Sequence, residues 1–384
     1  MVSHSREVGG AEVYVENLIR HLARESDLDW RPELICRRDR AVDGLAETVA
    51  EWAPVARLDF THLSDIAEIR RKMASASLVH LNLSYPTGKY LFGAATLARS
   101  LRRPLVVTHH LALEVGPPWR QLMRWLGRSA KQHIAVSRHA AAVLSRAYGY
   151  PADRVQVVHN GIDARRFKPA SPEDRSRLRR RAGETLDGHP WGDDVLLSCT
   201  VARLSPQKGL FELIDAAAQL ARQSVNFKMV VIGEGKLRRA LRDRIRDRGL
   251  ESQVFLAGSL PRSQVAEWLA ASDLFVLPSR YEGGPATALM EAMACGCAIV
   301  ATNVSGVNEL VTDESLGRLV PARDSDALAA SILDLLADAG LRAKMAERAR
   351  AKVLAEFTIE ASMRKTENVL IEALPTPPRL LSAR

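Results

Sequence analysis

The segment DLFVLPSRYEGGPATALMEAMACG, residues 273–296, joins a short apolar run to a glycine loop and then to a helical pattern. The run ends at Leu277, and its apolar residues do not alternate strictly with polar ones, which is typical of a strand covered on both faces. Pro285 suits the first turn of the following helix, and Gly296 suits the C-terminal cap of that helix. The segment therefore predicts a strand, a loop and a helix in succession.

Similar apolar runs recur along the chain, with helix-length polar segments between them. They form two series, the first at 33–36, 78–83, 104–108, 133–136 and 155–158, the second at 195–201, 227–232, 254–257, 273–277 and 298–301. A chain of 384 residues also exceeds what one hydrophobic core usually organises. We therefore expect an α/β protein with two Rossmann-like parallel-sheet domains facing across a cleft.

The N-terminal domain is expected to span residues 1–165 and the C-terminal domain residues 166–357. Between the two series, Asp163–Asp194 is rich in proline and carries the cluster Arg175, Arg177, Arg179, Arg180 and Arg181. We interpret this region as an interdomain linker that ends in a charged, solvated helix, with a nucleic-acid patch as the alternative. The proline-rich tail, residues 375–384, is expected to be disordered.

The composition of the chain indicates which kinds of partner, membrane association and metal site can be expected. The formal net charge of +9 indicates an anionic partner, although nucleic acid is disfavoured because the basic residues are not interleaved with aromatic ones. No apolar run approaches the ~20 residues of a membrane span, and residues 1–10 do not resemble a signal peptide. The four cysteines lack the spacing of a metal site, so we expect reduced thiols, no bound metal and a cytoplasmic protein.

Two loops of the first series follow strands, where parallel sheets bind ligands. Gly9 and Gly10 open a helical segment, and they form either a plain glycine turn or a loop that approaches a phosphate or a sugar. His110 follows the run 104–108, and it either bonds a sugar hydroxyl or is a satisfied histidine at the edge of the core. A metal pair with His109 is disfavoured, because adjacent residues of an extended chain point to opposite faces.

Two loops of the second series carry charged residues. Arg203 and Lys208 follow the run 195–201 and would suit a diphosphate leaving group, whose developing negative charge fixed cations stabilise. In the second loop, the amides of Gly283, Gly284 and Ala286 lie at a predicted helix N-terminus. Glu282 and Glu291 supply acceptors for sugar hydroxyls, since an ionised carboxylate only accepts hydrogen bonds.

With these four loops in view, the chain resembles the retaining glycosyltransferases of family 4, which have the two-domain GT-B fold. The resemblance covers nearly the whole chain and is most specific at 272–279 and 291–296. It is also carried by Gly9-Gly10-Ala11-Glu12, Val136-Ser137, Asn160-Gly161-Ile162-Asp163, Arg203, Lys208-Gly209 and Ile232-Gly233-Glu234-Gly235.

The resemblance implies a hexosyltransferase that moves a hexose or hexosamine from a nucleotide diphosphate sugar to a hydroxyl acceptor with retention of configuration. The acceptor would be a glycan, a lipid-linked saccharide or a small metabolite, and no cofactor or metal is implied. A helix at 358–374 would pack back on the first domain. A sugar-nucleotide epimerase, another GT-B enzyme and a noncatalytic basic binding protein are the alternative functions.

The resemblance also implies roles for individual residues. Arg203 and Lys208 would hold the diphosphate and Glu291 the ribose hydroxyls, while Glu282 with Gly283 and Gly284 would contact the transferred sugar. The remaining implied donor contacts are Gly10, Gly233, Gly258, Pro285 and Ala286. Gly9, Gly10 and His110 would lie on the acceptor side, with His110 near the reacting sugar; Arg203, Lys208, His110 and Glu282 would be the catalytic group.

The chain departs from the family pattern in the spacing of its two glutamates. Eight residues separate Glu282 from Glu291, one more than the family usually has. An insertion inside the helix would rotate the residues after it by about 100°. We therefore expect the extra residue in the turn at 283–285.

Residues 118–131 form an amphipathic helical pattern with an apolar face and a basic stripe of Arg120, Arg124, Arg128 and Lys131. One interpretation is a helix that rests on an anionic membrane, which would place the protein at the inner face of the membrane. The other is an ordinary helix that packs against the first domain.

Overall fold

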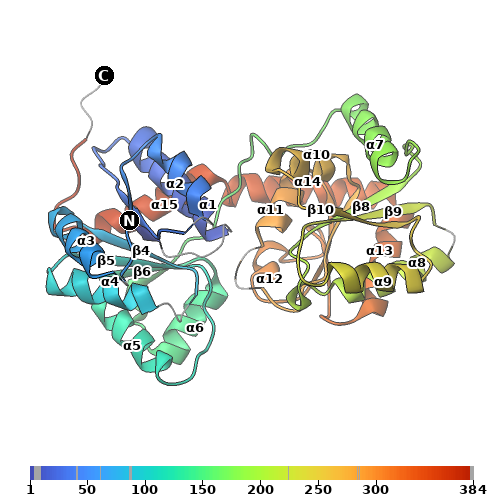
Figure 1. The fold of residues 1–384 in the computed structure, drawn as a ribbon. Helices are drawn as coiled ribbons and strands as arrows, with labels where there is room; N and C mark the ends of the chain where they lie inside the picture. The colour runs from blue at the N-terminus through green and yellow to red at the C-terminus, as the bar shows by residue number, and fades with distance from the viewer. Residues whose placement is uncertain are drawn as a thin grey trace. The chain divides into compact units, whose positions relative to one another are not determined.

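The computed structural model describes residues 1–3, 10–39, 42–60, 62–85, 89–223, 225–282, 284 and 286–380. It divides into two compact units, of which the first comprises Met1–Gly161 with Ile359–Arg384 and the second Ile162–Thr358 (Figure 1). Each unit is built on its own parallel sheet. The prediction of an α/β protein with two parallel-sheet domains is confirmed.

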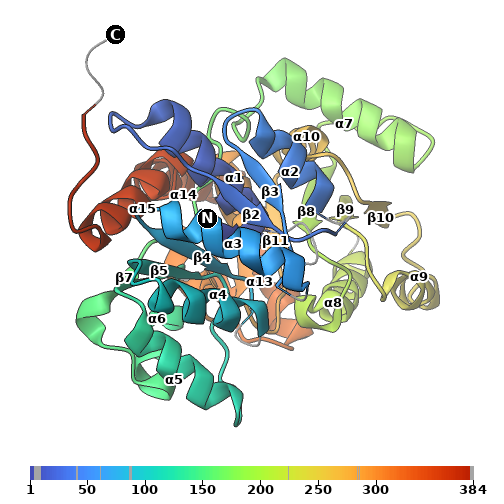
Figure 2. The same cartoon turned by 60° about the vertical axis from the view of Figure 1, so that its left-hand side comes forward.

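In its described residues, the first unit has a seven-stranded sheet in the order β3-β2-β1-β4-β5-β6-β7. Its strands are β1 (Val2–Ser3), β2 (Leu34–Cys36), β3 (Val55–Arg57), β4 (Val79–Leu83), β5 (Leu105–His109), β6 (Gln132–Ala135) and β7 (Val155–Val157). Its helices are α1 (Gly10–Arg20), α2 (Asp43–Ala50), α3 (Leu63–Ser75), α4 (Lys89–Ser100), α5 (Trp119–Ser129), α6 (Arg138–Tyr148) and α15 (Ile359–Ala373). One core lies against α3 to α6 and another against α1, α2 and α15 (Figure 2).

The described part of the second unit has a six-stranded sheet in the order β10-β9-β8-β11-β12-β13. Its strands are β8 (Leu196–Val201), β9 (Phe227–Ile232), β10 (Val254–Gly258), β11 (Leu274–Leu277), β12 (Ala298–Thr302) and β13 (Arg318–Val320). Its helices are α7 (Pro172–Leu186), α8 (Leu210–Arg222), α9 (Arg238–Asp247), α10 (Arg262–Ala271), α11 (Thr287–Ala294), α12 (Val307–Leu310), α13 (Ser325–Ala337) and α14 (Ala339–Glu356).

Alternate residues of the central strands enter different cores, which explains why the apolar runs are continuous. In β9, Val230 and Ile232 belong to one core of the second unit, whereas Met229 and Val231 belong to the other. Successive side chains point to opposite faces, so a strand covered on both sides is apolar throughout. The strands that the sequence did not reveal, β3 and β13, have three residues each.

Helix α7 corrects the interpretation of residues 163–194 as a linker with a solvated helix. It packs against α10 of the second unit, and Arg179 is buried. Asp273, at the start of β11, accepts from Arg179 at 2.6 Å and from Arg175 at 2.7 Å, and also from the amide of Leu197 at 2.8 Å. Two arginines of the cluster that predicted a solvated helix, Arg175 and Arg179, therefore belong to an ion network with Asp273.

The C-terminal segment belongs to the first unit. Helix α15, drawn in red, lies among the blue and teal elements of that unit and contacts α1, β5 and β6 (Figures 1 and 2). The described part of the tail differs from the expected disorder, because Asp29 donates its amide to the carbonyl of Arg379 at 2.8 Å and Leu28 forms a bridge with Leu380. The rest of the tail, residues 381–384, lies outside the described residues.

Helix α5 buries its apolar face. Met123 and Leu126 lie in the core of the first unit, with Trp119 and Leu122 packed against it. Arg120, Arg124 and Arg128 are exposed. No helix in the described residues is long and apolar enough to cross a membrane.

Candidate functional site

The sheet order places a topological switch point between β8 and β11 in the second unit, where the connections leave toward opposite sides. Such crevices at the carboxyl ends of parallel strands are where ligands bind. The loop after β8 carries Arg203 and Lys208, and the loop after β11 carries Glu282. The residues predicted from the two loops therefore meet at one sheet edge.

The backbones of the loops that follow β8 and β11 are in close contact. Gly209 has a φ of +62°, and a Cβ added there would lie 1.9 Å from the carbonyl oxygen of Pro278. Arg280 donates its amide to the carbonyl of Gln207 at 2.7 Å, and Gln207 donates its side-chain amide to the carbonyl of Tyr281 at 3.0 Å. Only glycine permits this approach, so Gly209 determines where Lys208 lies.

Lys208 and Glu282 form an ion pair at this edge. The ammonium nitrogen of Lys208 lies 2.5 Å from Oε1 of Glu282, and Ser279 donates its hydroxyl to the same oxygen at 2.6 Å. The side chain of Lys208 is 18% exposed and that of Glu282 is 8% exposed. The pair leaves further donors on the ammonium of Lys208, and the oxygen Oε2 of Glu282, for a ligand.

Arg203 and the glycines at 233 and 258 belong to the loops that follow β8, β9 and β10. Arg203 is exposed and begins the turn after β8, in which the amide of Ser205 bonds its carbonyl at 2.8 Å. Gly233, at the end of β9, donates its amide to the carbonyl of Gly258 at 2.8 Å. A Cβ on Gly233 would lie 2.0 Å from the carbonyl oxygen of Ala202, so the loops after β8, β9 and β10 are in direct contact.

Glu291 lies on α11 and is buried, with 6% of its surface exposed. Its Oε1 forms an ion pair with Arg262, the first residue of α10. Burial raises the pKa of Glu291 to about 7, although the nearby charges of Arg262 and Arg166 act to lower it. This pKa places the carboxyl between its neutral and ionised forms at neutral pH.

The segment between Glu282 and α11 is described only in part, so the place of the additional residue stays a prediction. Helix α11 is an α-helix from Thr287 to Ala294 and carries Glu291. Ala286 is the N-cap residue, and Gly296 follows the helix with a φ of +80°. Gly284 is held close to Gly306, at which a Cβ would lie 2.2 Å from the carbonyl oxygen of Gly284. Gly283 and Pro285 lie outside the described residues.

The first unit has the corresponding switch point between β1 and β4. Gly10 is the exposed first residue of α1, whereas Gly9 lies outside the described residues. His110 follows β5, where its Nε2 lies 3.4 Å from Oδ1 of Asn82 and its ring packs edge-on against Tyr14 at 4.9 Å. Burial lowers the pKa of His110 to about 3, so its imidazole is neutral.

The adjacent histidines have different surroundings. His109 is fully buried, with its Nε2 3.2 Å from Nδ1 of His133 and its ring against Tyr150. His110 faces Asn82 on the other side of the strand. In the described residues, no group of three or more His, Cys, Asp or Glu side chains is arranged to hold a metal ion.

Three residues of this geometry were not predicted from the sequence. Asn82 is a polar residue inside the apolar run of β4, which is a signal that a sequence can give. Ser279 lies two residues after the end of β11, in a loop position where ligand-binding residues occur. Arg262 gives no signal, because only the packing of α10 brings it to Glu291.

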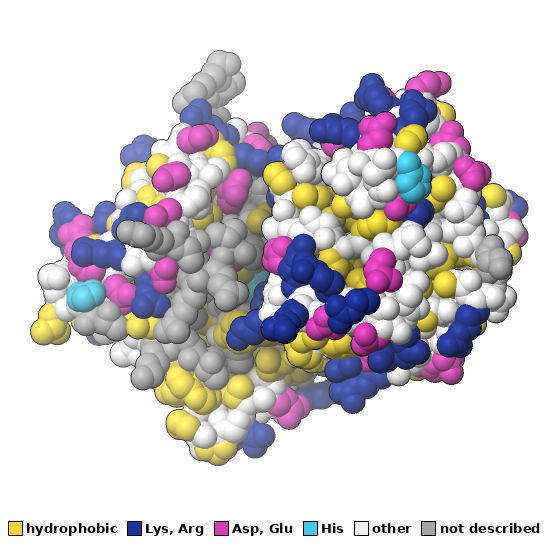
Figure 3. Space-filling view, turned by 45° about the vertical axis from the view of Figure 1, so that its right-hand side comes forward, with side chains coloured by type: hydrophobic (Ala, Val, Ile, Leu, Met, Phe, Trp, Pro, Cys, Tyr) yellow, Lys and Arg dark blue, Asp and Glu magenta, His cyan; other side chains and the backbone are white. Residues whose placement is uncertain are grey.

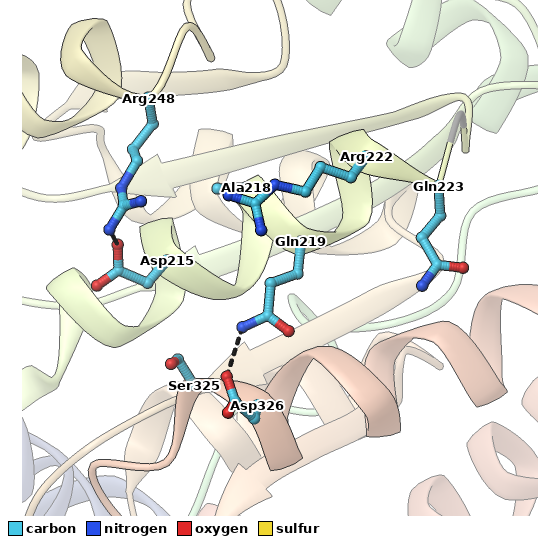
Figure 4. A pocket seen from close by; sticks show the side chains of 8 residues that line it. All are labelled: Asp215, Ala218, Gln219, Arg222, Gln223, Arg248, Ser325 and Asp326. Carbon is cyan, nitrogen blue, oxygen red and sulfur yellow. Dashed lines mark hydrogen bonds and ion pairs between the residues drawn. The ribbon is translucent and has the colours of Figure 1, made fainter.

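A separate crevice of about 530 Å³ lies beside α8 and the start of α13 (Figure 4). Arg248 forms an ion pair with Asp215 at 2.9 Å in this crevice, and the side-chain amide of Gln219 donates to Asp326 at 2.7 Å. None of the predicted site residues lines it. Lys and Arg side chains also gather on the face of the second unit visible in Figure 3.

Comparison with known proteins identifies the class. The model of the glycosyl transferases group 1 matches residues 184–352, and that of Glycosyltransferase Family 4 matches residues 8–166. An alpha-D-kanosaminyltransferase of Streptomyces kanamyceticus is 30% identical over 337 residues, which are 84% of this chain and 83% of the relative. A GDP-mannose-dependent monoacylated alpha-(1-6)-phosphatidylinositol monomannoside mannosyltransferase of Corynebacterium glutamicum is 30% identical over 269 residues, 68% of each chain.

Solved structures share the fold. The Anabaena protein Alr3699/HepE, solved in complex with UDP, superposes with a TM-score of 0.82 at 24% identity, over 96% of this chain and 98% of that one. Sucrose-phosphate synthase of Thermosynechococcus elongatus superposes with a TM-score of 0.76 at 21% identity, over 96% of this chain and 97% of that one. The fold is GT-B. The chain belongs to the group 1, family 4 glycosyltransferases, and it is an enzyme that transfers sugars.

Proposed function

We propose that this chain is a retaining glycosyltransferase that moves a hexose or hexosamine from a nucleotide diphosphate sugar to a hydroxyl acceptor. The observation that carries the proposal is the Lys208–Glu282 pair in the loops that follow β8 and β11, with Arg203 in the same loop as Lys208. It supplies fixed cations for a diphosphate beside a carboxylate for sugar hydroxyls. A GDP-mannose-dependent relative and a UDP-bound protein of the same fold are in keeping with such a donor.

In the proposed reaction, the acceptor hydroxyl attacks the anomeric carbon on the face that the phosphate leaves. The carbon–oxygen bond to the diphosphate breaks, the new glycosidic bond forms, and the hydroxyl proton passes to the departing phosphate oxygen. Lys208 and Arg203 stabilise the charge that develops on the diphosphate. Glu282 holds the transferred sugar, Glu291 accepts from the ribose, and neutral His110 bonds a sugar hydroxyl without adding a charge.

The experiment is a panel of nucleotide sugars, first screened for protection against thermal unfolding and then assayed for turnover with candidate acceptors. Release of the nucleoside diphosphate with formation of an α-linked product from an α-linked donor supports the proposal. An inverted product contradicts retention, and a changed sugar still attached to its nucleotide indicates an epimerase.

We also propose that turnover needs no metal or cofactor, because Lys208 and Arg203 can supply the positive charge that a metal would bring. Turnover should therefore survive exhaustive treatment with EDTA. Loss of activity that Mg²⁺ or Mn²⁺ restores would contradict this part of the proposal.

The acceptor is proposed to be a glycan, a lipid-linked saccharide or a small metabolite, met in the cytoplasm. Contact with an anionic membrane, if made by α5, would rest on Arg120, Arg124 and Arg128, because the apolar face of α5 is packed against the core. Sedimentation with phosphatidylglycerol vesicles at low salt, lost at high salt, tests this contact. An absence of sedimentation at low salt contradicts it.

A further inference from the structure

The two carboxylate oxygens of Glu291 differ in their hydrogen-bond partners. Oε1 is held by the guanidinium of Arg262, whereas Oε2 has no hydrogen-bond partner among the described residues. Arg262 in turn lies over the ring of Phe167, 5.5 Å from the ring centroid, and Phe167 is buried. The guanidinium is therefore fixed by an aromatic ring on one side and by the carboxylate on another.

Arg262 is a cation in direct contact with the carboxylate of Glu291, whose side chain is 7% exposed. The other charge that acts on Glu291 is that of Arg166, which lowers the pKa of Glu291 less than Arg262 does. The thiol of Cys295 on the same helix has a raised pKa and is neutral.

We propose that Arg262 is a positioning residue for nucleotide recognition, which holds Glu291 by Oε1 and leaves Oε2 to accept from the hydroxyls of the nucleotide ribose. This inference rests on the proposed role of Glu291 in binding the donor. Arg262 itself need not touch the nucleotide. It acts by fixing the carboxylate and by favouring its ionised form, which accepts hydrogen bonds with both oxygens.

The consequence is a pH dependence of nucleotide binding that Arg262 controls. Burial raises the pKa of Glu291 to about 7, and Arg262 opposes that rise. Affinity should therefore fall as the pH decreases through about 7 and the carboxylate takes up a proton. Without Arg262 the carboxyl loses its direct cation, so the loss of affinity should begin at a higher pH.

The test is the dissociation constant of UDP and of GDP for the full chain, measured by calorimetry from acidic to alkaline pH. Arg262→Met should weaken binding of the nucleotide roughly 10-fold at neutral pH and move the midpoint upward by about one pH unit, which corresponds to the loss of one close ion pair. Arg262→Lys should restore part of both effects. The matched control is Arg222→Met, because Arg222 is an exposed arginine of the same unit that lines the separate crevice.

The variant Glu291→Gln distinguishes the role of Glu291 in binding the nucleotide from the role of Arg262 in positioning Glu291. It should weaken nucleotide binding and remove the pH dependence of the dissociation constant. If Glu291→Gln binds the nucleotides like the unmodified protein, the proposed role of Glu291 is wrong. If Glu291→Gln weakens binding but Arg262→Met leaves affinity and midpoint unchanged, Arg262 is not a positioning residue.

Discussion

Lys208 and Glu282 show how single residues combine charge with burial. Neither side chain is fully exposed, and each is the direct ion partner of the other. In the proposed reaction, a cation held in such a site needs little rearrangement when the diphosphate leaves, so it would stabilise the transition state more than an exposed lysine.

Replacement of Lys208 by Met should lower kcat roughly 10²- to 10³-fold, because the developing charge of the diphosphate loses a fixed cation. Turnover with the preferred donor measures this effect, and circular dichroism checks that the fold is kept. Arg239→Met is the control, since Arg239 is exposed on α9 and its loss should leave turnover unchanged. Turnover of Lys208→Met close to that of the unmodified protein would rule out the role of Lys208.

Glu291 should make the second unit less stable at alkaline pH. Its pKa of about 7 in the folded protein exceeds the ordinary value of 4.5, so between these values the folded state binds more protons than the unfolded state. Stability therefore falls as the pH rises through this window. Glu291→Gln removes the linkage and should stabilise the protein by an amount on the order of 2–3 kcal/mol above about pH 8, but not near pH 4.5.

Urea unfolding curves of the two proteins at both pH values measure this difference. A stabilisation by Glu291→Gln that is equal at both pH values would show that the ionisation of Glu291 is not its cause.

At the scale of elements, the loops after β8 and β11 are joined by one glycine. Gly209→Ala should destabilise the second unit and reduce turnover, because the added Cβ would meet the carbonyl of Pro278 and push the loops apart. Gly249→Ala is the matched control: Gly249 has a similar φ of +65° but no atom within 4 Å of the added Cβ. Equal losses of stability in both variants would show that backbone strain alone, and not the contact between loops, is responsible.

Helix α7 depends on its ion network with Asp273. Asp273→Ala leaves the buried Arg179 without its carboxylate, which should cost about 3–5 kcal/mol of stability. By contrast, Arg177 and Asp174 form an exposed pair, so Arg177→Ala should cost less than about 1 kcal/mol. Urea unfolding compares the two variants, and a similar small loss in both would show that the network does not hold α7.

At the scale of the whole molecule, the two units should respond differently to acid. The first unit contains His80, His109 and His133, each fully or almost fully buried, and burial lowers the pKa of His80 to about 3 and of His133 to about 4. The pKa of His109 also lies well below its ordinary value. These groups stabilise the fold above pH 6.5, and that contribution is lost as the pH falls below it.

Near pH 5, each buried histidine of the first unit should have lost up to about 2 kcal/mol, which together is a large part of a typical stability. Hydrogen exchange measured peptide by peptide at neutral pH and near pH 5 should show loss of protection in β4, β5 and β6 before β8, β9 and β11. Earlier loss in the second unit would contradict this expectation.

Much of the fold could be predicted from the sequence, because buried strands of five or six residues, such as β5 and β9, form unmistakable apolar runs. Strands β3 (Val55–Arg57) and β13 (Arg318–Val320) have three residues each, one of which is an arginine, so they leave no continuous apolar run. The loop residues Lys208, Glu282 and His110 could be proposed because each follows a predicted strand. Arg262 could not, since its importance depends on Glu291, a side chain far away in the sequence.

The sequence by itself determined the class of fold, the family and the loops that carry the charged residues, because these follow from local runs and motifs. Only the tertiary structure decided which charges meet: Lys208 with Glu282, Arg262 with Glu291, and Arg179 with Asp273. The reason is physical, since the strength of an ion pair depends on distance and burial, and neither is encoded in the neighbouring residues.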